Sequence, residues 1–331
     1  MKLTPGKLRG LKAVSNKKGV IAAAAMDQRG SLQKSIAKEK GVADDQVTPE
    51  MMSEFKTAVT RILTPYASAI LLDPEFGLGA SKKRSKNAGL LLAYEKTGYD
   101  QVEKGRFPLL LPDWTVRRLK EAGADCIKIL LYYSPFEDAK VNDRKHAWVE
   151  RIGAECVAHD IPFFLEFVGY DPKGGDEKGP EFAKIKPAVV IKSMEEFSKK
   201  QYFVDVLKVE VPVNTAYVEG TRAFKGPAAQ TKKEALAIYK QAAKGTKKPF
   251  IYLSAGVSNN QFTENLELAA EAGVKFNGVL CGRATWKEGI PIYAKQGLKA
   301  LEDFLNTEGV KNIQSVNKAL ESASPWWKAY R

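Results

Sequence analysis

Charged residues stand inside segments of this sequence that are otherwise apolar enough to form buried strands. Lys128 interrupts CIKILLYY, Glu166 interrupts PFFLEFV, and Lys208 and Glu210 interrupt VLKVEVP. Burying a charge costs several kcal/mol unless the charge is paired or used for chemistry. Because side chains two apart on a strand share a face, Lys208 and Glu210 project to the same side. These four residues are therefore the first candidates for a reactive site.

A buried lysine beside a second cation is suited to attack a carbonyl carbon. Only the neutral amine is nucleophilic, and burial together with a like-charged neighbour lowers the pKa of a lysine. We therefore expect Lys128 to favour the neutral amine of a second lysine in the same pocket, which indicates a Schiff base. A glutamate such as Glu166, its pKa raised by the apolar surroundings, then carries protons for loss of water and for C–C cleavage. The alternative is an internal Lys–Glu network that only fixes the strand register.

Eight apolar segments alternate with helical patterns along the chain. Near-continuous apolar character is typical of strands covered on both faces, as in a parallel sheet. Thr48, Thr231 and Ser258 stand where helix N-caps belong, and Gly245 and Gly273 stand where two of these helices should end. The predicted strands cover residues 20–27, 68–74, 89–95, 126–133, 162–168, 206–212, 250–256 and 276–282.

This alternation predicts an α/β fold, either a closed (β/α)8 TIM barrel or an open doubly wound sheet. Eight strands favour the barrel, and the first strand is followed by DQRG (27–30) in place of a glycine-rich phosphate loop. We predict a single barrel domain over residues 1–331, with strands between about 20 and 282 and C-terminal helices over 283–331. Asp27, at the end of the first strand, then joins the buried charges at the active-site face of the barrel.

The loops after the last two predicted strands form a candidate phosphate site. Ser254 and Gly256 end the seventh strand, and Gly282 and Arg283 follow the eighth, where barrel enzymes commonly hold phosphate. The 52 Lys and Arg residues exceed the 39 Asp and Glu residues by 13, which also favours an anionic ligand. The lysines are scattered and no segment alternates basic with aromatic residues, so we expect no nucleic-acid partner.

Histidine scarcity argues against a metal site. The chain has only His146 and His159, both outside the predicted strands and 13 residues apart, so we expect surface roles for them and no metal or other cofactor. No segment is long and apolar enough for a membrane span or a secretion signal, and we expect a cytoplasmic protein without a membrane partner. The three cysteines are expected to be reduced core thiols: Cys126, Cys156 and Cys281.

From about residue 20 to its end, the sequence resembles the bacterial class I tagatose 1,6-bisphosphate aldolases. Long segments in the same order carry this resemblance, which makes it more specific than any single motif. They are DQRG (27–30), LLDPEFG (71–77), LLAYEKTGYD (91–100), RLKEAGADCIKILLYY (118–133), IPFFLE (161–166), VDVLKVEVPVN (204–214), IYLSAGVS (251–258), FNGVLCGRATW (276–286) and SPW (324–326).

The resemblance implies a TIM barrel that cleaves D-tagatose 1,6-bisphosphate to dihydroxyacetone phosphate and D-glyceraldehyde 3-phosphate without a metal, in lactose and galactose catabolism. It implies that Lys208 forms the Schiff base and that Glu166 is the acid and base, with Lys128 and Asp27 as partners in the pocket. The residues that it implies as substrate or phosphate contacts are Gln28, Arg29, Ser254 and Arg283.

Several alternatives stay open at this stage. Lys96, at the end of the third predicted strand, is a rival nucleophile. The segments 167–179 and 223–230 depart from the family pattern after two of the catalytic strands, so the substrate could be another ketose phosphate, such as fructose 1,6-bisphosphate or 6-deoxy-6-sulfofructose 1-phosphate. A non-catalytic sugar-phosphate sensor would share the same pocket, and the sequence leaves open whether the chain forms a homo-oligomer.

Overall fold

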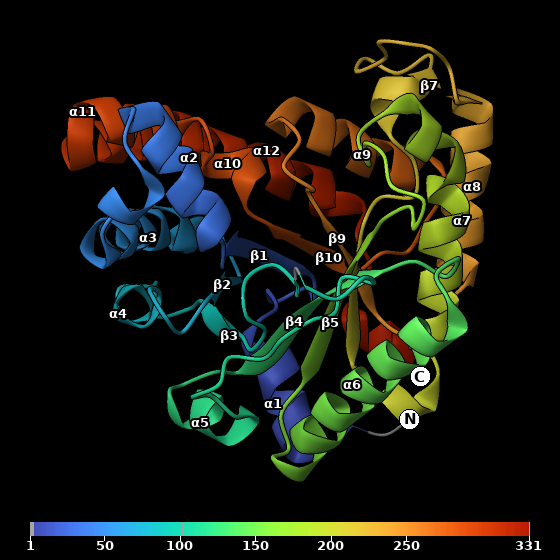
Figure 1. Ribbon diagram of the computed structural model, residues 1–331, viewed down its shortest axis with the longest axis horizontal. Coiled ribbons are helices and arrows are strands. Elements are labelled where there is room, and N and C mark those ends of the chain that lie inside the picture. The colour runs from blue at the N-terminus through green and yellow to red at the C-terminus, as the bar shows by residue number, and fades with distance from the viewer. Residues whose placement is uncertain (1–2, 101, 331) are drawn as a thin grey trace.

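Eight parallel strands close into a barrel in the computed structural model, which describes residues 3–100 and 102–330 (Figure 1). Around the barrel the strand order is β1-β10-β9-β6-β5-β4-β3-β2, and β7 and β8 form a separate two-stranded sheet. The barrel predicted from the alternation of strands and helices is therefore confirmed. The strands are β1 (Ile21–Met26), β2 (Ala69–Leu72), β3 (Gly89–Ala93), β4 (Cys126–Tyr133), β5 (Phe163–Gly169), β6 (Val206–Val209), β7 (Val218–Glu219), β8 (Gln230–Thr231), β9 (Phe250–Leu253) and β10 (Gly278–Cys281).

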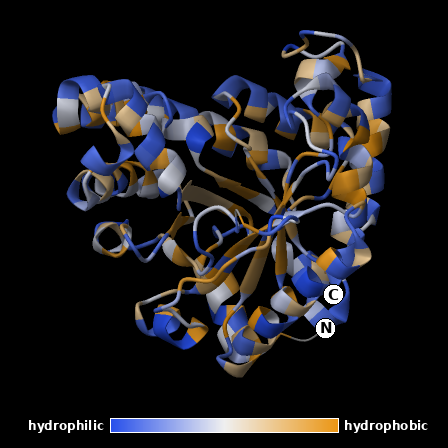
Figure 2. Ribbon diagram, in the orientation of Figure 1, coloured by the Kyte–Doolittle hydropathy of each residue, from blue (hydrophilic) through white to orange (hydrophobic). Residues whose placement is uncertain are grey.

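Helices surround the barrel, and the expected caps are present. The hydroxyl oxygens of Thr48, Thr231 and Ser258 each accept a hydrogen bond from a backbone N–H in the first turn of their helix. Apolar residues concentrate in the central strands, whereas the outer helices carry much of the polar surface (Figure 2). The α-helices are α1 (Pro5–Ala13), α2 (Gly30–Lys40), α3 (Pro49–Leu63), α4 (Leu78–Ser81), α5 (Val116–Glu121), α6 (Ala139–Ala158), α7 (Pro180–Phe197), α8 (Lys232–Lys244), α9 (Asn259–Glu271), α10 (Arg283–Trp286), α11 (Gly289–Phe304) and α12 (Val310–Ala319).

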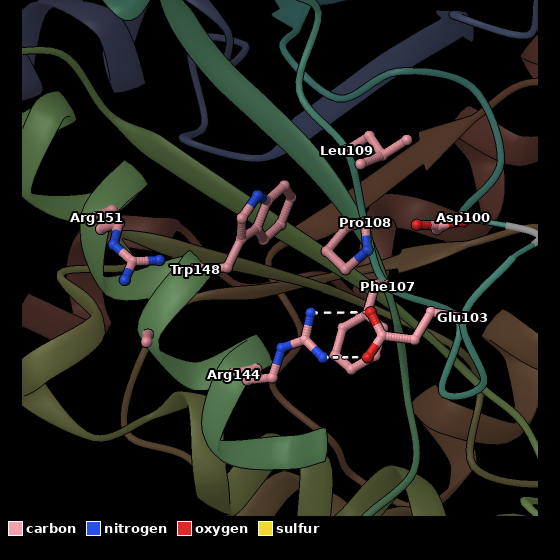
Figure 3. Close-up of a pocket in the computed structure, with 9 residues that line it drawn as sticks. Asp100, Glu103, Phe107, Pro108, Leu109, Arg144, Trp148 and Arg151 are labelled. Carbon is pink, nitrogen blue, oxygen red and sulfur yellow. Dashed lines mark hydrogen bonds and ion pairs between the residues drawn. The ribbon is translucent and has the colours of Figure 1, made fainter. Parts of the chain in front are cut away.

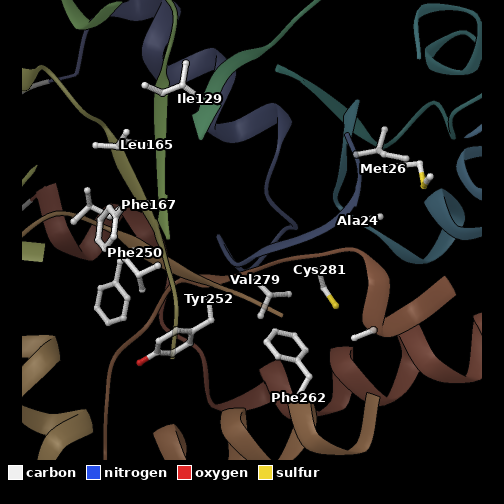
Figure 4. Packing of buried hydrophobic residues seen from close by; sticks show 14 of the residues in the cluster. Ala24, Met26, Ile129, Leu165, Phe167, Phe250, Tyr252, Phe262, Val279 and Cys281 are labelled. Atoms are coloured by element: carbon white, nitrogen blue, oxygen red, sulfur yellow. The ribbon is translucent and has the colours of Figure 1, made fainter. Parts of the chain in front are cut away.

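Alternate residues of each strand face two different apolar regions. Ile129 on β4 and Leu165 on β5 belong to the large cluster between the barrel and its helices (Figure 4). Their neighbours Cys126, Phe164 and Val206 belong to a smaller cluster in the barrel interior. Because side chains two apart on a strand share a face, the residues two positions beyond these three also face the interior, nearer the carboxyl ends of the strands.

Those residues are the buried charges predicted from the sequence. Lys128 follows Cys126, Glu166 follows Phe164 and Lys208 follows Val206 by two positions on β4, β5 and β6. Glu166 and Lys208 are direct register partners across β5 and β6. Lys128 is the register partner of Phe164, two residues before Glu166, so the three charges face the interior near the carboxyl ends of three neighbouring strands.

The opposite end of the barrel is closed by apolar packing and by one buried ion pair. Leu11 from α1 and Trp326 near the end of the chain pack in the interior cluster. The Lys7 ammonium lies 2.7 Å from the Asp205 carboxylate, directly before β6. Among the described residues no helix has the length and apolar character that crossing a bilayer requires.

All three cysteine thiols are unpaired and buried, as predicted for core thiols. Burial raises the pKa of the Cys281 thiol to about 12, although a hydrogen bond with Ser254 opposes the shift. Burial also raises the pKa values of the Cys126 and Cys156 thiols well above their ordinary range. None of these thiols is therefore a nucleophile at neutral pH.

Candidate active site

A cavity of about 1050 Å³ opens at the carboxyl ends of the barrel strands. Its size suits a small phosphorylated metabolite, because ligand pockets usually enclose about 300–1000 Å³. Its lining contains every site residue predicted from the sequence: Asp27, Gln28, Arg29, Lys128, Glu166, Lys208, Ser254, Gly256, Gly282 and Arg283.

One glutamate oxygen joins two lysines at the base of this cavity. Glu166 Oε2 lies 2.8 Å from Lys208 Nζ and 2.8 Å from Lys128 Nζ. Lys208 and Lys128 are only 3% and 0% exposed, so water screens these charges weakly. A proton can therefore pass directly between Lys208 and Glu166, which is the geometry that a lysine nucleophile and its base require.

Lys128 is surrounded by carboxylates. Its ammonium lies 2.8 Å from an oxygen of Asp27, of Glu95 and of Glu166. Burial alone would lower the pKa of Lys128, but the three carboxylates outweigh it and raise that pKa well above its ordinary value. Lys128 is therefore a permanent cation, and it occupies the centre of the acidic group.

The expected direction of the Glu166 pKa shift is wrong. Burial does favour the neutral acid, as the sequence analysis assumed, but Lys128 and Lys208 together lower the pKa of Glu166 below its usual range. Asp27 behaves in the same way, because both lysines outweigh its burial and lower its pKa. Glu166 is therefore a carboxylate in the resting protein and is ready to accept a proton.

Glu95, which was not predicted as a site residue, is the third carboxylate on Lys128. It follows β3 and is only 4% exposed, and its Oε2 has no hydrogen-bond partner in the described part of the protein. Burial raises the pKa of Glu95 even though Lys128 and Arg29 oppose this shift. Glu95 ends the predicted strand 89–95 as Asp27 ends the predicted strand 20–27, and a charge in that position could have identified it.

Arg29 lies at the cavity, but its guanidinium already has protein partners. Nη1 donates to Glu75 Oε2 at 2.7 Å, and Nη2 donates to the Glu95 backbone carbonyl at 2.6 Å. The residue is only 4% exposed. Within the described part of the chain, Nε is the guanidinium nitrogen that lacks a hydrogen-bond partner. The contacts of Nη1 and Nη2 connect the ends of β1 and β3 through Arg29 and leave little of the guanidinium for the implied phosphate contact.

Gln28 and Glu210 complete the polar lining near these strands. Gln28 Nε2 donates to Asp27 Oδ1 at 3.2 Å, while its Oε1 is buried without a partner among residues 3–100 and 102–330. Glu210 pairs with Lys186 at 3.1 Å and accepts a hydrogen bond from the Gly169 N–H at 2.8 Å. Glu210 thus fits the structural alternative considered for the buried charges, because both of its oxygens are used by the scaffold.

The loops after β9 and β10 meet as predicted. Gly256 has a φ of 74°, and a β-carbon there would lie 3.0 Å from the guanidinium carbon of Arg283. Arg283 is exposed at the cavity, whereas Ser254 beside it is buried. A left-handed backbone that only glycine adopts easily lets the chain approach Arg283 closely, and such a corner suits a phosphate.

Lys96 and the histidines lie outside the buried cluster of Lys128, Glu166 and Lys208. Lys96 lines the cavity but is exposed, whereas Lys208 is buried against Glu166. His146 is half-buried on α6, where its ring packs against Phe197 and Tyr202 and its Nε2 lies 3.0 Å from the Tyr133 hydroxyl. Among the described residues, no three His, Cys, Asp or Glu side chains form a group that could hold a metal.

A second, smaller hollow of about 310 Å³ lies on the outer surface beside α6 (Figure 3). Arg144 forms an ion pair with Glu103 there, and its guanidinium covers the Phe107 ring at 3.8 Å. Trp148 and Arg151 line the same hollow. Its described lining contains no buried nucleophile with an adjacent base, so the barrel cavity is the candidate active site.

Comparison with known proteins supports one family. A family model described as DeoC/LacD family aldolase matches residues 21–288. Tagatose 1,6-diphosphate aldolase 2 of Enterococcus faecalis is 51% identical over 329 residues, which cover 99% of this chain and 97% of that protein. The tagatose 1,6-diphosphate aldolase of Listeria monocytogenes serotype 4a is 50% identical over 331 residues, covering 100% and 96%. That of Staphylococcus aureus is 49% identical over 322 residues, covering 97% of each chain.

A solved structure shares the fold at much lower sequence identity. Fructose-bisphosphate aldolase from Plasmodium falciparum superposes with a TM-score of 0.70 at 15% identity, covering 98% of this chain and 97% of the other. At this identity the likeness concerns the barrel alone.

Proposed function

Because this chain belongs to the DeoC/LacD family of aldolases, we propose that it reversibly cleaves D-tagatose 1,6-bisphosphate to dihydroxyacetone phosphate and D-glyceraldehyde 3-phosphate, as a metal-independent class I enzyme. Lys208 forms the Schiff base with C2 of the ketose. The contact of 2.8 Å between Lys208 Nζ and Glu166 Oε2, deep in the barrel, is the observation that carries this proposal.

The number of carboxylates around each lysine supports Lys208 as the nucleophile. Lys128 is held as an ammonium by Asp27, Glu95 and Glu166, so it cannot supply a neutral amine. Lys208 has one ion-pair partner in the described part of the chain, Glu166, which can take its proton. Lys128 then remains as a fixed positive charge that stabilises substrate oxygens as they become negative.

Proton transfers by Glu166 connect the steps. Glu166 accepts the proton of Lys208, and the neutral amine adds to C2 to form a carbinolamine. Glu166 returns the proton to the C2 hydroxyl, which leaves as water, and an iminium remains. Glu166 then accepts the C4 hydroxyl proton while the C3–C4 electron pair moves to the iminium, which releases the aldehyde. Protonation of the enamine at C3 and hydrolysis release dihydroxyacetone phosphate and restore Lys208.

The corner of Gly256, Gly282 and Arg283 holds the phosphate next to C2. It follows β9 and β10, and β9 is the direct neighbour of β6, which carries Lys208. A phosphate there accepts hydrogen bonds from the guanidinium of Arg283 and from nearby backbone N–H groups. The rest of the sugar then extends toward Glu166, Lys128 and the ends of β3 and β1.

Borohydride reduction tests this assignment. The protein is incubated with dihydroxyacetone phosphate, reduced, digested and mapped by mass spectrometry, with the Lys208→Met variant as the control. We expect one adduct on the peptide that contains Lys208 and none in the variant. An adduct on Lys96 or Lys128, or no adduct with an active protein, contradicts the proposal.

Chelation tests the metal-independent part separately. We expect cleavage of tagatose 1,6-bisphosphate, measured by coupled oxidation of NADH, to continue unchanged after dialysis against EDTA. Complete inactivation that zinc restores points to a metal mechanism instead.

A further inference from the structure

A fully buried lysine lies behind the cavity wall, on α3. Lys56 is 0% exposed, and its ammonium lies 2.6 Å from Asp73 Oδ2. It also donates to the backbone carbonyls of Met26 at 2.8 Å and of Gln28 at 2.7 Å. These two carbonyls stand on either side of Asp27, where the chain has left β1 and needs other partners for its polar groups.

Lys56 is fully buried and faces the scaffold, not a substrate. Its ammonium donates hydrogen bonds to two backbone carbonyls and forms an ion pair with the buried Asp73 carboxylate, so its polar contacts are all with the scaffold. Lys56 is also absent from the cavity lining, whereas Asp27 and Gln28 are part of it. Any effect of Lys56 on the reaction must therefore act through the backbone that it holds.

We propose that Lys56 is a positioning residue which fixes the turn after β1, so that the Asp27 carboxylate stays in contact with the Lys128 ammonium. The inference rests on the proposed function, since it concerns the charge beside the Schiff-base lysine. Asp27 Oδ2 lies 2.8 Å from Lys128 Nζ, and small displacements at such contacts are costly. A misplacement of about 1 Å at a reacting group can reduce the rate about 100-fold.

The opposite end of the barrel offers a matched control. Lys7 and Asp205 are also a buried lysine–aspartate pair, 2.7 Å apart. In both pairs the aspartate also accepts a backbone hydrogen bond, from the Phe76 N–H for Asp73 and from the Phe163 N–H for Asp205. The Lys7 pair therefore contributes to the fold in a similar way but lies far from the cavity mouth.

The experiment compares two double variants, Lys56→Met/Asp73→Asn and Lys7→Met/Asp205→Asn. Removing both charges avoids leaving a buried carboxylate unpaired, so both proteins should fold, which circular dichroism and the melting temperature will verify. We expect the Lys56 pair variant to lose about 100-fold in kcat while its KM changes less than about threefold. We expect the Lys7 pair variant to keep kcat within about threefold of the parent.

A second measurement asks whether the effect passes through Asp27. In an Asp27→Asn background the Lys56 pair substitution should lower kcat by less than a further factor of about three, because effects that act through one group are not additive. The inference is overturned if the kcat losses from Asp27→Asn and from the Lys56 pair substitution multiply. It is also overturned if the two pair variants lose kcat equally, or if the Lys56 pair variant keeps the kcat of the parent. If the parent protein cleaves no ketose phosphate, the proposed function fails and the inference falls with it; an active parent matched by the Lys56 variant refutes the inference alone.

Discussion

Replacing Lys128 by methionine removes the cation that three buried carboxylates share. Each of Asp27, Glu95 and Glu166 loses a contact of 2.8 Å. Removing one partner of a buried ion pair costs about 3–5 kcal/mol in the free energy of unfolding. We therefore expect Lys128→Met to lose about that amount at pH 7, together with its aldolase activity.

The sign of the pH dependence follows from the pKa shifts. Burial raises carboxyl pKa values, and in the parent protein Lys128 and Lys208 reverse this effect at Asp27 and Glu166. Without Lys128, at least one carboxyl binds a proton in the folded state between pH 5 and 7, while carboxyls of the unfolded chain, with pKa values near 4, do not. Each such proton makes the variant less stable by about 1.4 kcal/mol per pH unit as the pH rises.

Urea denaturation at pH 5 and pH 7 measures both quantities. The control is Lys184→Met, which removes an exposed lysine from its pair with Glu181 and should change stability by less than about 0.5 kcal/mol at either pH. If Lys128→Met costs less than about 1 kcal/mol at pH 7, or the same amount at both pH values, then Lys128 does not hold the carboxylates as described.

Three further outcomes are expected. Arg283→Ala should lower kcat/KM for tagatose 1,6-bisphosphate about 10- to 100-fold, since a charge-assisted hydrogen bond contributes about 1.5–3 kcal/mol; steady-state kinetics with an unchanged kcat/KM would exclude a phosphate contact. Because the Glu166 pKa is lowered, its ion pairs contribute their full stability above pH ~4.3 and lose it as the pH falls through the folded-state pKa. Glu166 should therefore remain a carboxylate down to that pH, and a pH profile in which kcat/KM already falls on acidification from above pH ~6 would contradict the assignment. Finally, a thiol reagent at pH 8 should modify no cysteine of the native protein and three after denaturation, and rapid native labelling would show that these thiols are accessible: Cys126, Cys156 and Cys281.

Strand positions and most of the site could be predicted from the sequence because the barrel interior imposes a strong pattern. Each of the eight barrel strands lies within a predicted apolar segment, apart from one residue at the end of β5. A charge inside such a segment is conspicuous, and the two-residue period assigns it to a face. Lys128, Glu166 and Lys208 were found for this reason, without knowledge of the neighbouring strands.

The residues that escaped prediction lack this contrast. Lys56 lies on an amphipathic helix, where a lysine ordinarily faces water, and only the packing of α3 against β1 shows that it is buried. Glu95 stands at the end of its predicted segment, two residues beyond β3, and does not interrupt an apolar run. The direction predicted for the Glu166 pKa was wrong because the shift depends on how many cations contact its carboxylate. The distances from Lys128 and Lys208 to Glu166 cannot be obtained from the sequence.

The two-residue offset from an interior apolar side chain to a charged one has a consequence for insertions. On β5, the distance from Phe164 to Glu166 is one full pleat. A single residue inserted between them would leave the composition of β5 nearly intact, yet would turn Glu166 outward to the helix layer. Deleting one residue would do the same, whereas a two-residue change would restore its orientation one step higher. Within this strand, only insertions or deletions of an even number of residues keep each side chain on its face. We therefore expect length variation among relatives to occur in the connecting loops.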